Sequence, residues 1–253
     1  MDNVTARYQQ ELKHTRQVVR NRVEEHWRAL PDYRDHQIKP FLEKVLPVVR
    51  AGQERAVALT DAYMSHKAGL QKPVGLSVDK LVGAAVRNGV EPAEVYQRPF
   101  VTVWSSIEKI GIALAATKAL NRLLSTADMD VAMSARDASV AFGQVSDSRT
   151  IGWTRVADPS CCDFCQSIDG ARIYVDDPAP LHNNCGCTVE PIIGSGDSGP
   201  ISREDFDNIA PGAVFDDAKI EEHGELGPVI TDKHDEFTSV HDLPASYEKQ
   251  VNP

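Results

Sequence analysis

All five cysteines of this 253-residue chain lie within 27 residues of one another, and a histidine lies among them. Two thiolates separated by two residues can both reach one ion from a tight turn. A second pair of donors, about a dozen or more residues later, can complete a tetrahedron around Zn²⁺. Sulfur and imidazole donors favour zinc over magnesium or calcium, which prefer oxygen. The candidate metal ligands are Cys162, Cys165, His182, Cys185 and Cys187.

Cys162 and Cys165 form the first half of the predicted site, because Cys161 would break the two-residue spacing. The second half offers one imidazole and two thiolates for two places. We expect His182 to bind with one of the two later cysteines, and a site of four cysteines is the alternative. Four protein ligands leave no open coordination position, so we expect one structural Zn²⁺ per chain.

Disulfides and simple buried cysteines are the other interpretations of this cluster. A secreted disulfide scaffold would spread its cysteines along the chain and would follow a signal peptide, whereas the first seven residues are polar. Glu108, Lys109 and Lys118 interrupt the central apolar segment, so no stretch approaches the roughly 20 apolar residues of a membrane span. We therefore expect a soluble protein that is made in a reducing cytoplasm and does not contact a membrane.

The net charge of -10 is concentrated at one end of the chain. Residues 1–194 carry 23 acidic and 23 basic side chains, whereas residues 195–253 carry 14 acidic and 4 basic ones. An acidic segment repels nucleic acid, and the mild basic excess in the first fifty residues is typical of a solvated helix surface. The charge distribution does not predict sequence-specific binding of nucleic acid.

Residues 1–149 are predicted to form a helical region. Apolar side chains recur at steps of three and four residues, which gives each predicted helix one apolar stripe that we expect to pack in a core. Pro31 should end the first helix, Pro47 should kink or divide the second, and Thr126 is a candidate N-cap for the last. The stripe of the first helix is Val4, Tyr8, Leu12, Val19, Val23, Trp27 and Leu30, and the second helix runs from about Phe41 to Met64. The stripe of the third helix is Val103, Ile107, Ile110, Leu114 and Thr117. The last helix, Asp128–Val145, has the stripe Val131, Ala135, Ala138, Phe142 and Val145.

Beyond residue 150 the pattern changes to short β-rich runs at residues 153–156, 173–175 and 188–193, separated by Gly, Pro and Asp. Residues 150–194 are too few for a large core, so metal binding should supply much of their folding energy. Residues 195–253 begin with a Gly- and Ser-rich linker and are predicted to be an acidic, largely extended tail. The predicted fold class is α+β: a helical region, a small β-rich zinc-binding module and the tail.

The motifs of residues 150–194 resemble a known family. Arg155-Val156, the Cys162-x-x-Cys165 pair, Asp169-Gly170, Ile173-Tyr174, the His182-x-x-Cys185-x-Cys187 group and Pro191 are similar to the C-terminal module of the phage Mu F-like minor head proteins. The adjoining Val-Glu-Pro looks most like versions from phages that infect actinobacteria. Cys161 departs from the family pattern, in which a single cysteine enters the motif.

The resemblance implies a minor capsid protein for head morphogenesis, present in multiple copies per particle. Its implied partners are the portal protein, other capsid proteins and the scaffold. Such proteins aid head assembly, DNA packaging or ejection, so the implied location is inside the virion head, and the host cytoplasm during assembly. A zinc-binding interaction module unrelated to phages is the alternative.

The residues do not favour an enzyme. A zinc deaminase would carry His-x-Glu before its cysteine pair, but His26 and His66 are not followed by glutamate at that spacing. A thiol hydrolase would pair one cysteine with a distant histidine, whereas His182 lies three residues from Cys185, at metal-ligand spacing. A zinc- or thiol-dependent hydrolase is therefore the least favoured reading.

Overall fold

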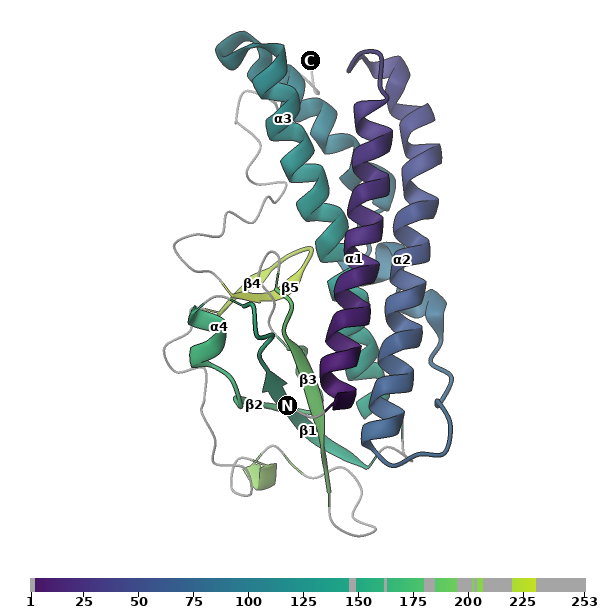
Figure 1. Cartoon of the computed structure of the whole chain (residues 1–253), viewed down its shortest axis with the longest axis vertical. Coiled ribbons are helices and arrows are strands. Elements are labelled where there is room, and N and C mark those ends of the chain that lie inside the picture. The colour runs from purple at the N-terminus through teal and green to yellow at the C-terminus, as the bar shows by residue number, and fades with distance from the viewer. Residues whose placement is uncertain are drawn as a thin grey trace.

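The computed structural model describes residues 3–145, 149–161, 163–179, 185–194, 202, 204–206 and 220–230. The fold is mainly helical, with a small antiparallel sheet beside the helices (Figure 1). The elements in chain order are α1 (Asn3–Arg28), η1 (Asp35–Gln37), α2 (Ile38–Lys67), η2 (Val78–Lys80), η3 (Gly83–Arg87), α3 (Pro92–Gly143), β1 (Thr150–Val156), α4 (Asp163–Ser167), β2 (Arg172–Tyr174), β3 (Thr188–Ile193), β4 (Ile220–His223) and β5 (Gly227–Ile230).

The first two helices pack along each other through the stripes that the sequence predicts. In α1, Tyr8, Leu12, Val19, Val23 and Trp27 are buried, and the helix ends before Pro31, as predicted. Helix α2 is continuous across Pro47, so the predicted division of this helix is wrong. The rings of Trp27, Phe41 and Phe100 pack edge to face, with centroids 5.1 to 5.6 Å apart, and join both helices to α3.

Helix α3 is two helical arms that fold back on each other. Gly111 has non-helical dihedral angles (φ 76°, ψ 162°) and separates a first arm, residues 92–110, from a second arm, residues 112–143. The Tyr96 hydroxyl donates a hydrogen bond to Asp130 Oδ2 at 2.7 Å across 34 residues. A straight helix would place these residues about 50 Å apart, so the chain must reverse between them. The predicted helix start at Thr126 is wrong, because Thr126 lies inside the second arm.

Replacing Gly111 with alanine should destabilise the hairpin of the two arms. The dihedral angles of Gly111 fall in a region that is open essentially to glycine alone, so a Cβ atom is expected to cost about 1 to 3 kcal/mol of unfolding free energy. Chemical denaturation of the purified variant measures this loss. Gly224→Ala is the matched control, since Gly224 is exposed and has open space around its would-be Cβ. If both variants were equally stable, the reversal would not require glycine at position 111.

The reversal exposes apolar side chains that the sequence predicted to be core. Ile107 and Ile110 are 38% and 41% exposed, and Leu114 is 62% exposed, whereas Val103 on the same predicted face is fully buried. Ile107, Ile110 and Leu114 lie within four residues of Gly111, at the end of the hairpin. We call the exposed set the apolar tip. It consists of Trp104, Ile107, Ile110, Ile112 and Leu114.

By length and composition alone, one described helical segment, Val78–Gly143, is apolar enough to cross a membrane, which the sequence analysis did not expect. Of its most apolar window, 28% is buried. The segment contains the reversal at Gly111 and the apolar tip. Its composition therefore reflects an exposed apolar surface as well as a bundle core.

The sheet has the strand order β2-β1-β3, and all of its pairs are antiparallel. Its three strands overlap the predicted β-rich runs, and it lies beside the lower half of the bundle in Figure 1. Trp153 on the central strand is buried and packs into the same apolar cluster as the helices. A Cβ on Gly143 would lie 2.8 Å from the Trp153 ring, so glycine allows the end of α3 to approach the sheet. The sheet thus shares the core of the helices through Trp153, and a smaller separate cluster of sheet residues surrounds Phe206.

Strands β4 and β5 pair with each other in a hairpin, residues 220–230, that packs against η3 and α3. We call it the docked hairpin. It lies within the predicted acidic tail, and the prediction of a largely extended tail missed it. The other residues of that tail, apart from 202 and 204–206, and the predicted linker 195–200 lie outside the described residues.

Candidate metal centre

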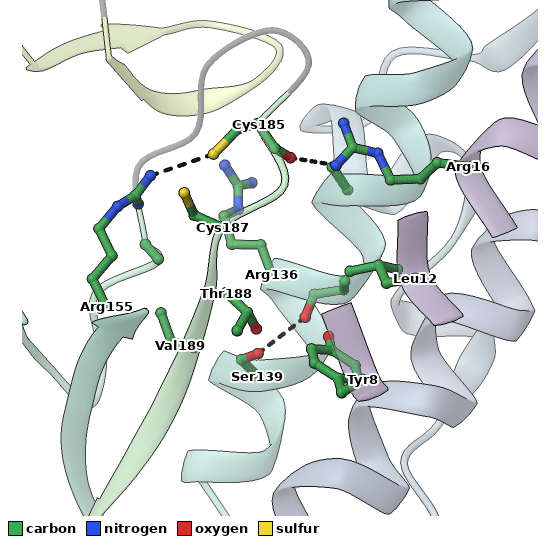
Figure 2. Close-up of a pocket in the computed structure, with 13 residues that line it drawn as sticks. Tyr8, Leu12, Arg16, Arg136, Ser139, Arg155, Cys185, Cys187, Thr188 and Val189 are labelled. Carbon is green, nitrogen blue, oxygen red and sulfur yellow. Dashed lines mark hydrogen bonds between the residues drawn. The ribbon is translucent and has the colours of Figure 1, made fainter. Parts of the chain in front are cut away.

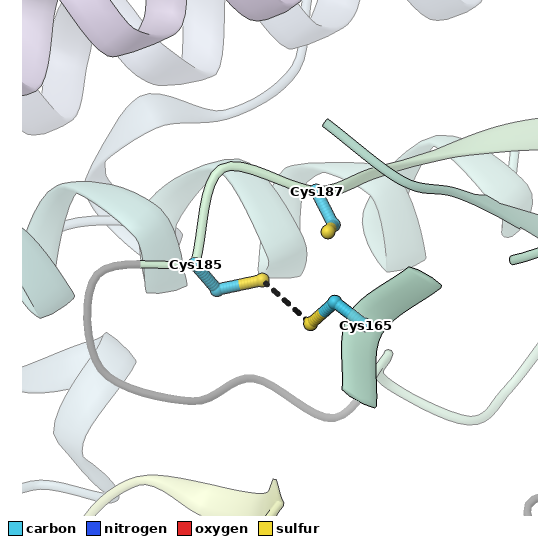
Figure 3. A group of neighbouring side chains, drawn as sticks. All are labelled: Cys165, Cys185 and Cys187. Carbon is cyan, nitrogen blue, oxygen red and sulfur yellow. Dashed lines mark hydrogen bonds between the residues drawn. The ribbon is translucent and has the colours of Figure 1, made fainter. Parts of the chain in front are cut away.

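Three of the predicted ligands converge in the structure. The sulfur atoms of Cys165, Cys185 and Cys187 all lie within 4.8 Å of one another, and the three side chains are buried (Figure 3). Cys165 lies on α4, and the other two precede β3. The Cys165 and Cys185 sulfurs are 4.0 Å apart. Four sulfurs bound tetrahedrally to zinc at about 2.3 Å would lie about 3.8 Å from each other, so this spacing fits one shared ion.

The other candidates take different places. Cys162 and His182 lie outside the described residues. Cys161 is partly buried and packs against the three cysteines, but its sulfur is not in the group that could hold an ion. His182 was expected to bind with one of Cys185 and Cys187, with a four-cysteine site as the alternative. The structure places the sulfurs of both cysteines beside that of Cys165, and the role of His182 stays a prediction. The sulfurs of Cys165 and Cys185 are far beyond the roughly 2 Å of a disulfide bond.

A buried arginine lies against this cysteine cluster, which consists of Cys165, Cys185 and Cys187. Arg155 on β1 is 2% exposed, and its Nη2 lies 3.4 Å from the sulfur of Cys165. The same nitrogen lies 3.4 Å from the sulfur of Cys185 (Figure 2). The backbone N–H of Asp158 donates to the Cys187 sulfur at 3.4 Å. Donors of this kind favour the ionised, metal-binding form of a thiol, because they place positive charge beside the sulfur. The sequence showed Arg155 only as part of a family motif, without this role.

When no cation is bound, the close approach of the three sulfurs opposes ionisation of the thiols. Hydrogen bonds with Cys185 and Cys187, together with burial, raise the pKa of the Cys165 thiol far above its ordinary value. A hydrogen bond with Cys165 lowers the pKa of Cys187, but the contact with Cys185 and burial outweigh it and raise this pKa to about 12. Without a metal the Cys165 and Cys187 thiols are therefore protonated at pH 7. A divalent cation would stabilise the thiolates, as metal ions do for coordinating thiols.

The cysteine cluster also shifts the pKa of Arg155. Burial alone would lower the pKa of its guanidinium, but the sulfurs of Cys185, Cys187 and Cys165 outweigh burial and raise it above the ordinary value. Arg155 therefore remains charged beside the sulfurs. A centre of three or four thiolates around Zn²⁺ has a net negative charge, and a buried guanidinium in contact with it lowers the cost of burying that charge.

Helix α1 positions the metal module through a row of polar side chains on one face. Four residues at steps of four, four and three each donate a hydrogen bond to the segment 156–190, so one helix face follows the module along its length. The four contacts are Thr5 Oγ1 to Glu190 Oε1, Gln9 Nε2 to the Val156 carbonyl oxygen (3.2 Å), Lys13 Nζ to Ser160 Oγ (3.0 Å) and Arg16 Nη1 to the Cys185 carbonyl oxygen. We call these four residues of α1 the polar row.

The last member of the polar row is held in place by an acidic partner. Arg16 forms a two-pronged ion pair with Asp128 of α3, with Nε 3.0 Å from Oδ1. Both side chains are buried, at 7% and 5% exposure. The pair fixes the guanidinium that binds the Cys185 backbone (Figure 2). Helix α1, helix α3 and the segment that carries Cys185 and Cys187 therefore form one connected unit.

A small cavity lies between the cysteine cluster and the helices, lined in part by Tyr8, Arg16, Arg136, Arg155 and Cys187 (Figure 2). Its volume is about 30 Å³, close to that of one water molecule. Substrate pockets are commonly ten or more times larger. Among the described residues, the space between the cysteines and the helices is therefore small.

Comparison of the chain with family models, with curated proteins and with solved structures found no match. The function of the site must therefore be argued from its own geometry and from the motifs in its sequence.

Proposed function

We propose that this chain is a non-enzymatic minor head protein of a tailed phage, in which one structural Zn²⁺ ties a small β-rich module to a helical bundle. The observation that carries the proposal is the convergence of Cys165, Cys185 and Cys187 within the stretch that resembles the Mu F-like module. The fourth ligand is Cys162 or His182. Cys162 is the stronger candidate, because the two-residue spacing to Cys165 suits one ion.

The geometry around the cysteines supports a structural role for the metal. The three sulfurs are buried, and the cavity beside them is about 30 Å³. A fourth protein ligand would close the coordination sphere and leave no position for a substrate or a reactive water. The metal then acts as a crosslink between α4 and the start of β3, and no hydrolase or deaminase activity is proposed.

The apolar tip supports a docking role for the helical bundle. Exposed apolar patches on soluble proteins commonly mark surfaces that other proteins cover. Trp104, Ile110 and Leu114 lie at one end of the α3 hairpin, away from the sheet, so the tip can be covered while the metal module stays free. We propose that the tip docks on the portal protein or the inner capsid wall, with the scaffold as a further contact during assembly.

Particles are the direct test of this assignment. Mass spectrometry of purified proheads and virions should find the chain at a fixed, low copy number. A phage that carries Leu114→Glu should lose at least about nine-tenths of this incorporation, because a charge at the tip opposes burial against a partner. Val18→Glu is the matched control, because Val18 is an apolar side chain on α1 that is 45% exposed outside the tip, and this variant should incorporate normally.

Two results would reject the proposal. If the chain occurs in infected cells but never in particles of any stage, the head assignment is wrong, and a cytoplasmic zinc-binding interaction module remains. If the Leu114→Glu protein is folded and incorporates like the parent chain, the tip is not the docking surface.

A further inference from the structure

The docked hairpin is held on the helices by a buried carboxylate between two arginines. Arg98 Nη2 lies 2.7 Å from Glu225 Oε1 and Arg98 Nη1 lies 2.9 Å from Oε2, while Arg87 Nη1 lies 3.2 Å from Oε2. All three side chains are buried, with exposures of 4% to 9%. A bidentate arginine–carboxylate contact is among the strongest and most direction-dependent pairings of protein side chains. The arginine pair, Arg87 and Arg98, thus binds the carboxylate of Glu225 specifically.

Two further contacts capture the backbone of the hairpin turn. The Asn88 side-chain amide donates to the Gly224 carbonyl oxygen at 2.7 Å, and Arg136 Nη1 donates to the Leu226 carbonyl oxygen at 2.7 Å. These carbonyls lie on either side of Glu225. The residues of η3 and α3, with Asn88, therefore bind the backbone of the turn as well as the Glu225 carboxylate.

Apolar contacts complete the interface. Leu226 and Val229 are 6% and 2% exposed, and they form one cluster with side chains of η3 and of the second arm of α3. The receiving side chains are Val86, Met129, Ala132 and Met133. Together with the arginine pair these side chains make up the surface that receives the docked hairpin, which we call the groove.

The groove is organised by the helices themselves. Arg87 Nε lies 2.5 Å from Asp130 Oδ1, and the Tyr96 hydroxyl donates to the other oxygen of the same carboxylate. Asp130 thus holds Arg87 in position without help from the hairpin. Asp130 balances only one of the two guanidinium charges, and Glu225 supplies the second negative charge.

The docked hairpin is separate from the rest of the β-structure. Its two strands pair with each other and not with the β2-β1-β3 sheet. A lone two-stranded hairpin is at best marginally stable in water, so its order depends on the groove. Phe206 is buried and packs against the sheet, and 13 residues separate it from Ile220. That length permits the hairpin to leave and return while Phe206 stays in place.

We propose that this groove is a peptide-recognition site for an acidic turn of the type Gly-Glu-Leu-Gly, and that residues 220–230 are its resident, exchangeable ligand. When the resident hairpin leaves, the same sequence from a second copy of the chain can bind in its place. The groove then links copies of the protein by exchange of their C-terminal hairpins, independently of the metal centre.

The test uses the full chain carrying Glu225→Lys and a fluorescent synthetic peptide of residues 218–232 with the parent sequence. Lysine facing the arginine pair should eject the resident hairpin, so residues 223–229 should lose hydrogen-exchange protection while zinc content and the main melting transition persist. The peptide should bind this variant and should bind the parent chain at least about 100-fold more weakly, because the parent groove is filled. A peptide with the same Glu225→Lys change should also bind at least about 100-fold more weakly.

Glu94→Lys is the matched control, because Glu94 is exposed on the same helix arm as Arg98 and undergoes the same change of charge. It should behave like the parent chain. The proposal fails if the Glu225→Lys chain keeps full protection of residues 223–229, or if it releases the hairpin but does not bind the peptide. Global unfolding of both Glu225→Lys and the milder Glu225→Gln would show that the hairpin is an integral part of the core, and would overturn the proposal as well.

Discussion

Replacing Cys165 with serine is expected to abolish metal binding by the purified protein, from about one zinc per chain to almost none. The sulfur of Cys165 is the contribution of α4 to the cysteine cluster, so its loss removes the crosslink to the start of β3. Metal binding at structural zinc sites is coupled directly to folding and supplies on the order of 10 kcal/mol. Metal analysis and hydrogen exchange of residues 157–194 measure the two effects.

The helices should survive this change, because their stripes pack on one another without the metal. The helical circular dichroism signal should therefore stay nearly constant. Cys161→Ser is the matched control: the same substitution, four residues earlier, at a cysteine whose sulfur lies outside the cluster. Loss of zinc in both variants, or in neither, would contradict the assignment of the ligands.

Replacing Asp128 with alanine should cause a large loss of stability. The change leaves the buried guanidinium of Arg16 without its counter-charge, and removing one partner of a buried ion pair commonly costs about 3 to 5 kcal/mol. For a chain of this size the melting temperature should fall by about 10 °C. Thermal and chemical denaturation measure the loss.

A surface ion pair provides the comparison. Glu25 pairs with Arg22 at 2.9 Å, and both side chains are 62% exposed. Glu25→Ala should therefore cost less than about 1 kcal/mol, because exposed ion pairs gain little over hydrated charges. If Asp128→Ala lowered the free energy of unfolding as little as Glu25→Ala, Arg16 would not be the fixed link between α1 and the segment that carries Cys185.

Patterns that depend on near neighbours in the sequence predicted their elements well. The stripes of α1 and α2 and the three strands of the sheet follow periods of 3.6 and 2 residues, and these periods depend only on local geometry. The cysteine spacing likewise identified Cys165, Cys185 and Cys187, because ligands of one ion must lie close together on short turns. The metal itself and its fourth ligand stay predictions.

Features that depend on distant partners were missed. The reversal at Gly111 was not predicted, because a single glycine inside an apolar helical run reads equally well as a tolerated helix residue. The polar row of α1 looked like a solvated face, since nothing in its sequence indicates that Gln9 or Arg16 meets residues well over a hundred positions later. The docked hairpin was missed for the same reason: Glu225 looked like part of a repelling acidic run until the arginine pair was in view.

The polar row also bears on the order in which the protein is made. Thr5, Gln9, Lys13 and Arg16 bind partners that are 147 to 185 residues further along the chain. At a synthesis rate of about 5 to 20 residues per second, the first helix leaves the ribosome roughly ten to thirty seconds before these partners do. During that interval Gln9 and Lys13 still lack these partners, whereas Thr5 and Arg16 can already meet Tyr63 of α2 and Asp128 of α3. The apolar stripe of the first helix can also pack on α2 and α3 already. The nascent chain should therefore form a helical intermediate on the ribosome. The metal module should join it afterwards, and the docked hairpin should follow.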